Sequence, residues 1–283
     1  MAGVVAVTTP GTPGLFATLV KRALTAAVGI PLFVWIVAGG PRWMFALLVV
    51  ALSGAAAWEL MRMFERAGRA VYGRLGVAGA AAVTASFLAP GFTVTAVVFT
   101  LAVAATLSVP VWADGVLAVE PVAATLLPIA YVGWLLGHGL LLRELPDGTH
   151  LVLFLVGTTW AGESAAYVIG SAVGRHPLSP GISPRKTVEG AAGQLAASVV
   201  AGAVLGAWFV PQWSVATAML AGGLLGVVGQ IGDLGESVIK RSLGAKDTGG
   251  LIPGHGGVLD RLDGLLFNTP ALFYYASWMG GRG

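Results

Sequence analysis

Long apolar runs recur along the chain from residue 23 to residue 279, and short polar or Pro/Gly-rich breaks separate them. A helix needs about 20 apolar residues to cross roughly 30 Å of hydrocarbon, and the runs approach this length. The pattern predicts an all-α, polytopic membrane protein with about nine transmembrane helices. Their expected bounds are 23–39, 43–61, 73–89, 92–110, 121–142, 150–173, 190–209, 215–233 and 262–279.

The composition agrees with a membrane protein. Of the 283 residues, 56% are hydrophobic and 10% are charged, whereas a soluble domain has about 25% charged residues. The chain has no cysteine, which excludes disulfides and cysteine-ligated zinc, so any metal must bind oxygen or histidine. The N-terminal segment has no basic region before its apolar stretch, and we expect no cleaved signal peptide.

The basic residues predict the orientation, because cytoplasmic loops of membrane proteins accumulate lysine and arginine. With nine spans and a cytoplasmic N-terminus, 13 of the 16 basic residues fall on the cytoplasmic side. The three on the other side are Arg42, Arg143 and Arg282. The two long late loops, near 174–189 and 234–261, then share the cytoplasmic face.

Three parts of the chain follow from this layout. We expect residues 1–22 to be an N-terminal lead-in and residues 23–149 to be a scaffold of transmembrane helices. Residues 150–283 form the expected catalytic region, because they contain both long cytoplasmic loops.

Acidic residues concentrate in this catalytic region. Seven of the 13 lie between residues 159 and 263, namely Glu163, Glu189, Asp233, Glu236, Asp247, Asp260 and Asp263. Several fall at the expected membrane depth, where a carboxylate costs at least about 2.5 to 3.5 kcal/mol unless it meets a cation or water. A functional site explains why they gather there.

A polar stripe follows the eighth apolar run. Asp233, Glu236, Ser237, Lys240 and Arg241 have the spacing i, i+3, i+4, i+7 and i+8, which places them on one face of a helix. The stripe is acidic at depth and basic toward the cytoplasm, an order that suits a cation with phosphates above it. The alternative is an ordinary helix end, with a Glu236–Lys240 pair worth a few tenths of a kcal/mol.

A glycine-rich segment, Pro253 to Gly257, places three glycines around His255. Backbone N–H groups in such a loop can bind phosphate, although glycine-rich loops also connect helices without any ligand. Asp260 and Asp263 follow as the last helix begins. Their carboxylates either complement the helix dipole or bind a divalent cation together with Asp233.

The earlier loop, Gly174 to Gly190, contains prolines that prevent a helix, and Thr187 is a candidate N-cap for the seventh span. Arg185 and Lys186 precede Thr187, so this helix N-terminus is a candidate phosphate site. The positive-inside rule explains the same two residues equally well.

Other polar residues receive simpler interpretations. Glu163 lies inside the otherwise apolar sixth span and is a functional candidate, with a buried, protonated glutamate as the alternative. Glu59 ends the second span beside Arg62 and Arg66, and this cluster is interpreted as charge that sets the orientation. No role is assigned to the histidines His138, His150 and His176.

These segments resemble the signature of phosphatidate cytidylyltransferases, also called CDP-diacylglycerol synthases. The resemblance covers Ser237 to Asp263 with its spacing intact, and it extends to Gly232–Ser237 and Ile182–Gly190. Two positions depart from the family pattern: Glu163 stands where the family usually has aspartate, and Gln194 where it has a second glycine. The first 140 residues fit only by hydropathy.

The resemblance implies an enzyme of the cell membrane that transfers the cytidylyl group of CTP to phosphatidic acid, with its active site facing the cytoplasm. Mg²⁺ is the implied cofactor, and a second cation such as K⁺ is an option. No nucleic acid partner is expected, and a homodimer is left open.

The implied metal ligands are Asp233, Asp260, Asp263 and Glu163. The other implied catalytic residues are Lys240, Arg241, Lys246, Asp247 and His255. Implied substrate contacts are Ser183, Arg185, Lys186, Thr187, Glu189, Ser237, Gly254, Gly256, Gly257 and Arg261.

Two rival classes stay open. An ion-coupled transporter would bind ions at Glu163 and Asp233, but it predicts matching features in two halves, and the sequence has no such repeat. A related membrane enzyme would also use CTP, either as a lipid kinase or as a transferase that acts on a prenyl or ether lipid. The motif does not distinguish hydrophobic tails.

Overall fold

The computed structural model describes residues 15–112, 119–252 and 256–280, with side chains from Ala27 onward in the first helix. The first half contains α1 (Leu15–Ala38), α2 (Arg42–Arg66), α3 (Gly73–Ser86), α4 (Phe92–Trp112), α5 (Val119–Pro128), the π-helical η1 (Ile129–Trp134) and α6 (Leu135–Glu144). The second half contains α7 (Gly148–Val173), β1 (Pro177–Ser179), β2 (Ser183–Thr187), α8 (Val188–Phe209), α9 (Val215–Ser242), the 3₁₀-helical η2 (Leu259–Arg261) and α10 (Asp263–Gly280). The predicted all-α class is confirmed, apart from one short hairpin.

Each of the nine predicted apolar segments lies in a helix or extends at most three residues beyond it, and the fifth runs through α5, η1 and α6. Among the residues that the structure describes, six helical segments are long and apolar enough to cross a membrane. They are α2, Phe92–Val111 of α4, Val119–Glu144, α7, α8 and α9. In contrast, α3 has 14 residues, and a helix of this length spans about 21 Å. The chain is therefore a multi-pass helical protein, while nine spans and a cytoplasmic N-terminus stay predictions.

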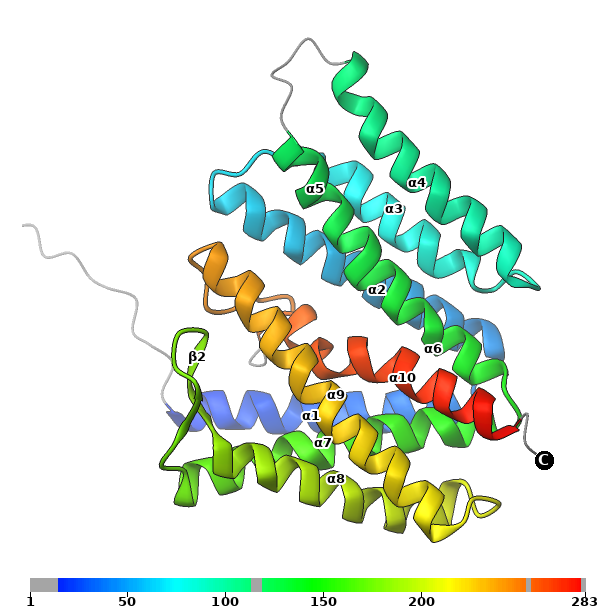
Figure 1. Ribbon diagram of the computed structural model, residues 1–283, viewed down its shortest axis with the longest axis vertical. Coiled ribbons are helices and arrows are strands. Elements are labelled where there is room, and N and C mark those ends of the chain that lie inside the picture. The colour runs from blue at the N-terminus through cyan, green and yellow to red at the C-terminus, as the bar shows by residue number, and fades with distance from the viewer. Residues whose placement is uncertain (1–14, 113–118, 253–255, 281–283) are drawn as a thin grey trace, which may run out of the picture.

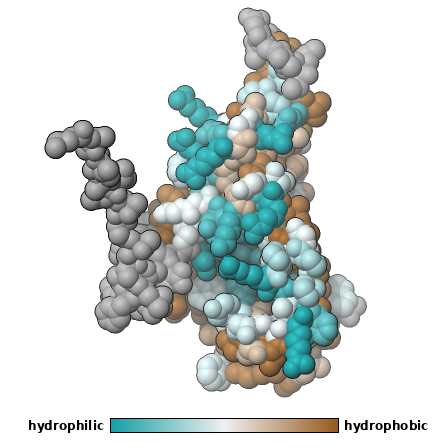
Figure 2. Space-filling view, turned by 90° about the vertical axis from the view of Figure 1, so that its left-hand side faces the viewer, coloured by the Kyte–Doolittle hydropathy of each residue, from teal (hydrophilic) through white to brown (hydrophobic). Residues whose placement is uncertain are grey.

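The connections that carry many of the basic residues lie at one end of the molecule. Figure 1 shows the loop between α2 and α3, the β1–β2 hairpin and the segment after α9 at the left-hand end, with the C-terminus at the right. A hydrogen bond of 3.1 Å from Arg241 Nε to Ile182 O joins two of these segments. Seen from that end, hydrophilic residues gather in the middle of the face (Figure 2).

Helix α9 extends beyond the predicted apolar run 215–233. It begins after Ser214, whose Oγ accepts a hydrogen bond from Thr217 N at 3.1 Å, and it ends at Ser242. Gly244 has a φ of 66°, a conformation that glycine adopts without a Cβ penalty and that commonly stops a helix. The polar stripe is one continuous helical face, as its spacing predicts.

Small residues bring α7, α8 and α9 into close contact. A Cβ added to Gly222 of α9 would overlap Ser198 O of α8, and a Cβ added to Gly162 of α7 would overlap Ser198 Oγ. Small residues let the backbones of membrane helices approach one another. Because Gly162 precedes Glu163, this packing also positions the turn of α7 that carries the intramembrane carboxylate.

The predicted loop 174–189 forms a short antiparallel hairpin of β1 and β2. Its prolines exclude a helix, as expected, but the strands were not predicted from the sequence. Thr187 ends β2 and caps α8, because its Oγ1 accepts a hydrogen bond from Gly190 N at 3.1 Å. The predicted N-cap is confirmed, and Arg185 and Lys186 are held beside the start of α8.

Candidate active site

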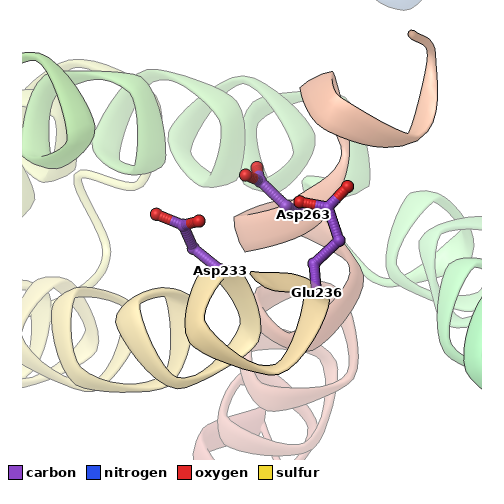
Figure 3. A group of neighbouring side chains, drawn as sticks. All are labelled: Asp233, Glu236 and Asp263. Atoms are coloured by element: carbon purple, nitrogen blue, oxygen red, sulfur yellow. The ribbon is translucent and has the colours of Figure 1, made fainter. Parts of the chain in front are cut away.

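Three carboxylates converge where α9 meets α10. One oxygen each of Asp233, Glu236 and Asp263 lies within 4.8 Å of the others, and Figure 3 shows the first two on α9 and the third on the start of α10. The helices approach closely because Gly232 has no side chain: a Cβ there would lie 2.8 Å from Asp263 O. Carboxylate oxygens are the ligands that Mg²⁺ prefers, so this group can hold a divalent cation.

Glu236 is the most buried member of this group, with no exposed surface. Its Oε1 has no hydrogen-bond partner within the described part of the chain. Leaving a buried carboxylate oxygen without a partner is costly, which makes this atom a suitable donor to a bound cation. The donor set fits a magnesium ion by its chemistry and by this unpartnered oxygen.

Two lysines neutralise the carboxylates. Lys186 of β2 lies with its Nζ 2.7 Å from Asp233 Oδ1. Lys240 of α9 lies 2.9 Å from Glu236 Oε2 and 2.9 Å from Asp260 Oδ1. The pairing of Glu236 with Lys240, one of the two interpretations of the stripe, is confirmed, and the same lysine also reaches Asp260.

Asp260 was predicted to bind a metal, but its carboxylate accepts hydrogen bonds from protein groups instead. Besides Lys240, its carboxylate accepts hydrogen bonds from Thr248 N (3.1 Å) and Gly257 N (3.0 Å). Burial raises the pKa of Asp260, but the hydrogen bond and charge of Lys240 and the two N–H donors outweigh burial, so the pKa lies below its ordinary value. Glu236 takes the place among the three clustered carboxylates that the sequence assigns to Asp260. Metal ligation by Asp260 stays a prediction.

A polar cavity of about 480 Å³ gathers many of the predicted site residues. It is lined by Glu163, Asp233, Lys240, Asp247, Gly256, Asp260, Arg261 and Asp263. They come from α7, α9, η2, α10 and the segment between α9 and η2. Gly256 has a φ of 84°, which favours glycine there. We call this space the phosphate cavity.

A second cavity, of about 490 Å³, lies between α7, β2, α8 and α9. It contains the predicted contacts Arg185, Lys186 and Thr187, and it shares Glu163 and Asp233 with the phosphate cavity. Its other lining residues include Tyr167, Gln194 and Gln230. Tyr167 is 78% exposed on the outer surface of α7, so this space borders the lateral surface of the helices. We call it the lateral cavity.

Several predicted site residues line neither cavity. Arg241 donates to Ile182 O and to Ala245 O at 3.0 Å, and so ties the hairpin to the segment after α9. Glu189 accepts hydrogen bonds from Arg175 N (3.1 Å) and His176 N (3.2 Å), and its Oε1 lies 2.6 Å from His176 Nδ1. The remaining ones are Ser183, Ser237, Lys246 and Gly257. Their substrate roles stay predictions.

The predicted phosphate loop is described only in part. Gly254 and His255 lie outside the described residues, and Gly257 N donates to Asp260. Glu59 is not among the predicted site residues. Its side chain is nevertheless fully buried and packs against Gly257 of this loop. The available signal was an acidic residue within an apolar run, which is costly without a partner.

These features define a multi-pass helical membrane protein whose carboxylates and lysines surround two adjacent cavities at one end. The model of the cytidylyltransferase family matches residues 20–279, which is most of the chain. The chain belongs to the cytidylyltransferase family.

Curated relatives narrow the comparison. The chain is 44% identical over 135 residues to a Synechocystis protein named phosphatidate cytidylyltransferase, which covers 47% of this chain and 45% of that one. It is 40% identical over 151 residues to an Escherichia coli protein named "Uncharacterized protein YnbB", covering 53% and 50%. It is 39% identical over 150 residues to a Staphylococcus saprophyticus phosphatidate cytidylyltransferase, covering 53% and 57%. The chain spans about half the length of the curated relatives it matches.

Proposed function

We propose that this protein transfers the cytidylyl group of CTP to phosphatidic acid in the cell membrane, giving CDP-diacylglycerol and pyrophosphate. The observation that carries the proposal is the pair of adjacent cavities, one polar and one lateral, which share the lining residues Glu163 and Asp233. A water-soluble triphosphate and a lipid phosphate can reach such a site from different sides. Family membership and the names of two relatives support the same reaction.

The reaction joins two anions, and this explains the charges of the site. A phosphate oxygen of phosphatidic acid forms the new bond to the α-phosphorus of CTP. The bond from this phosphorus to the oxygen bridging the β-phosphate breaks, and its electron pair leaves with pyrophosphate. The residues must hold the two anions in line and neutralise them, without a covalent intermediate.

Asp233, Glu236 and Asp263 would hold Mg²⁺, and Glu163 would be a further ligand, since it lines both cavities. A bound magnesium ion supplies charge neutralisation for phosphate oxygens. These four carboxylates would also accommodate a second cation such as K⁺. Asp260 acts in this proposal through Lys240, which its carboxylate holds at 2.9 Å.

Basic residues divide between the two substrates. Lys240 and Arg261 line the phosphate cavity and would neutralise the triphosphate and the leaving pyrophosphate. Arg185 and Lys186 line the lateral cavity and would bind the phosphatidate headgroup. The lipid tails would lie along the exposed surface of α7 near Tyr167. Asp147 and Gln212, bonded at 3.0 Å, belong to the opposite end and take no part.

The proposed orientation places this end of the molecule in the cytoplasm, where CTP is found. Its support is the predicted 13 to 3 division of the basic residues. A homodimer stays open. Cysteine substitutions in the β1–β2 hairpin and in the loop between α8 and α9 would test the orientation in inside-out vesicles, because only the hairpin cysteine should react with a membrane-impermeant maleimide added outside.

The direct test is incubation of the purified protein with radiolabelled CTP, phosphatidic acid and Mg²⁺. We expect a labelled CDP-lipid and an equal amount of pyrophosphate. A label that enters a prenyl or ether lipid, but not phosphatidic acid, would assign another lipid substrate. Ion uptake without any CTP turnover would assign the transporter class instead.

A further inference from the structure

Glu59 is a buried carboxylate that the proposed reaction does not use. It lies in α2, near the end of that helix which carries Arg62 and Arg66, and its side chain has no exposed surface. A buried carboxylate is costly unless its oxygens accept hydrogen bonds. The partners of Glu59 therefore indicate what its position stabilises.

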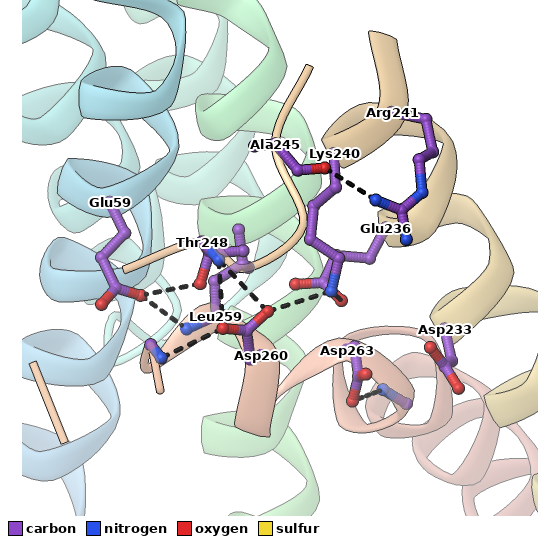
Figure 4. Close-up of polar contacts among 12 residues, drawn as sticks. Glu59, Asp233, Glu236, Lys240, Arg241, Ala245, Thr248, Leu259, Asp260 and Asp263 are labelled. Atoms are coloured by element: carbon purple, nitrogen blue, oxygen red, sulfur yellow. Dashed lines mark hydrogen bonds and ion pairs between the residues drawn. The ribbon is translucent and has the colours of Figure 1, made fainter. Parts of the chain in front are cut away.

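Both described partners belong to the segment between α9 and α10. Glu59 Oε2 accepts hydrogen bonds from Leu259 N at 2.9 Å and from Thr248 Oγ1 at 3.3 Å. These residues lie 200 and 189 positions away along the chain. Figure 4 shows the carboxylate reaching from α2 toward them. One side chain of the N-terminal half thus holds both ends of this segment.

Two glycines fit closely around the same carboxylate. A Cβ added to Gly249 would lie 2.5 Å from Glu59 Oε1, and a Cβ added to Gly257 would lie 2.6 Å from Glu59 Oε2. Real Cβ atoms do not approach other heavy atoms this closely. Because Glu59 is fully buried, its carboxylate has little space to move. The loop backbone at Gly249 and Gly257 therefore packs directly against this carboxylate.

Two residues that contact or pack against Glu59, Thr248 and Gly257, also bind Asp260. Thr248 N and Gly257 N donate to the Asp260 carboxylate, which in turn accepts from Lys240. We propose that Glu59 is a positioning residue that fixes Thr248 and Leu259, and thereby orients Asp260 and Lys240 toward the phosphate cavity. Glu59 itself contacts no substrate. The kinetic consequence rests on the proposed function, whereas the effect on the loop does not.

The shape of Glu59 suggests a set of variants. In Glu59→Gln the amide oxygen can replace Oε2 and accept both hydrogen bonds, so only the charge is lost. Glu59→Ala removes the acceptor, and Glu59→Asp draws it back by one methylene. Gly249→Ala presses on the carboxylate from the loop side. Glu65→Gln is the control, since Glu65 lies on the same helix but is half-exposed and paired with Arg62 at 3.2 Å.

Hydrogen exchange of the purified protein tests the first step. In Glu59→Ala and Gly249→Ala, we expect the amides of residues 245–252 and 256–261 to exchange faster, because the anchored backbone opens locally. Glu59→Gln and Glu65→Gln should keep wild-type protection there. Unchanged protection of this segment in both Glu59→Ala and Glu59→Asp would overturn the proposal.

Steady-state kinetics test the second step. We expect kcat/KM for CTP to fall about 10- to 100-fold in Glu59→Ala, as for other groups that orient a binding residue. The KM for phosphatidic acid should change less than about twofold, and Glu59→Gln should recover most of the activity. A purely structural role predicts lower thermal stability with wild-type KM values in the folded fraction, which would refute positioning. If wild-type protein makes no CDP-lipid, the proposed function fails, and the exchange experiment alone decides the role of Glu59.

Discussion

Lys186 Nζ lies 2.7 Å from Asp233 Oδ1, and this ion pair joins the β1–β2 hairpin to α9. Both side chains are partly buried, with exposed fractions of 24% and 33%. Both also line the lateral cavity, while Asp233 lines the phosphate cavity as well. The pair therefore marks the boundary where a lipid phosphate would meet the carboxylates of α9 and α10.

The first prediction concerns Lys186. In Lys186→Gln, we expect kcat/KM for phosphatidic acid to fall about 10- to 100-fold, because a hydrogen bond to a charged group contributes about 1.5 to 3 kcal/mol. The KM for CTP should change much less. Initial rates measured against phosphatidic acid in mixed micelles check this. Arg175→Gln is the matched control, because Arg175 precedes the same hairpin and its side chain lines neither cavity. Equal losses in the two variants would show that general charge, rather than a headgroup contact, is responsible.

The second prediction concerns the three clustered carboxylates. Asp233→Asn should abolish CTP-dependent product formation, whereas Glu236→Gln should raise the Mg²⁺ concentration for half-maximal rate about 10- to 100-fold. Both substitutions replace a charged carboxylate by a neutral amide, which is a weaker ligand for Mg²⁺. Magnesium titration of the purified variants, with a chelator-treated sample as the zero point, measures the effect. Asp147→Asn, at the opposite end of the molecule, should behave as wild type. A wild-type magnesium requirement in Glu236→Gln would remove Glu236 from the metal site.

The polar stripe of α9 could be predicted from the sequence because helical periodicity is a local property. Asp233, Glu236 and Lys240 lie on one face whatever the helix packs against. The contact of Glu59 with Thr248 could not be predicted in this way, since no periodic pattern encodes a pairing across 189 residues. The sequence supports only the weaker inference that a carboxylate in an apolar run needs a partner.

The metal ligands illustrate the same limit. Asp260 and Glu236 are both acidic and both close to Asp263 in the expected fold, so the sequence offers no reason to choose between them. The choice depends on Lys240, which lies between the two carboxylates, and on the loop amides that bind Asp260. Backbone donors of an irregular loop follow from its conformation, which sequence patterns leave undetermined.

The third prediction concerns Glu163, which lines both cavities. A Cβ added to Gly264 of α10 would lie 2.5 Å from Glu163 Oε1. We expect Gly264→Ala to lower the activity, because its methyl group would displace the Glu163 carboxylate that lines both cavities. Glu163→Asp shortens the side chain and should relieve this contact. In the double variant the two changes should therefore be non-additive, with a higher activity than Gly264→Ala alone. Additive losses would show that the two residues do not press on each other.

The fourth prediction concerns pH and Asp260. The pKa of Asp260 lies below its ordinary value because Lys240 and two backbone N–H groups stabilise the carboxylate more than burial disfavours it. A group with a lowered folded-state pKa stabilises the protein above its unfolded-state pKa, and this contribution is lost as the pH falls through the folded-state value. Asp260→Asn should therefore melt at a lower temperature than wild type at pH 7, and the difference should shrink as the pH falls below the ordinary value of 3.8. Asp147→Asn serves as the control, because Asp147 lies at the opposite end of the molecule, where its Oδ2 accepts a hydrogen bond from Gln212 Nε2. Thermal unfolding in detergent at pH 7 and at successively lower pH measures the difference. A difference in melting temperature between wild type and Asp260→Asn that stays constant with pH would contradict the role assigned to these hydrogen bonds.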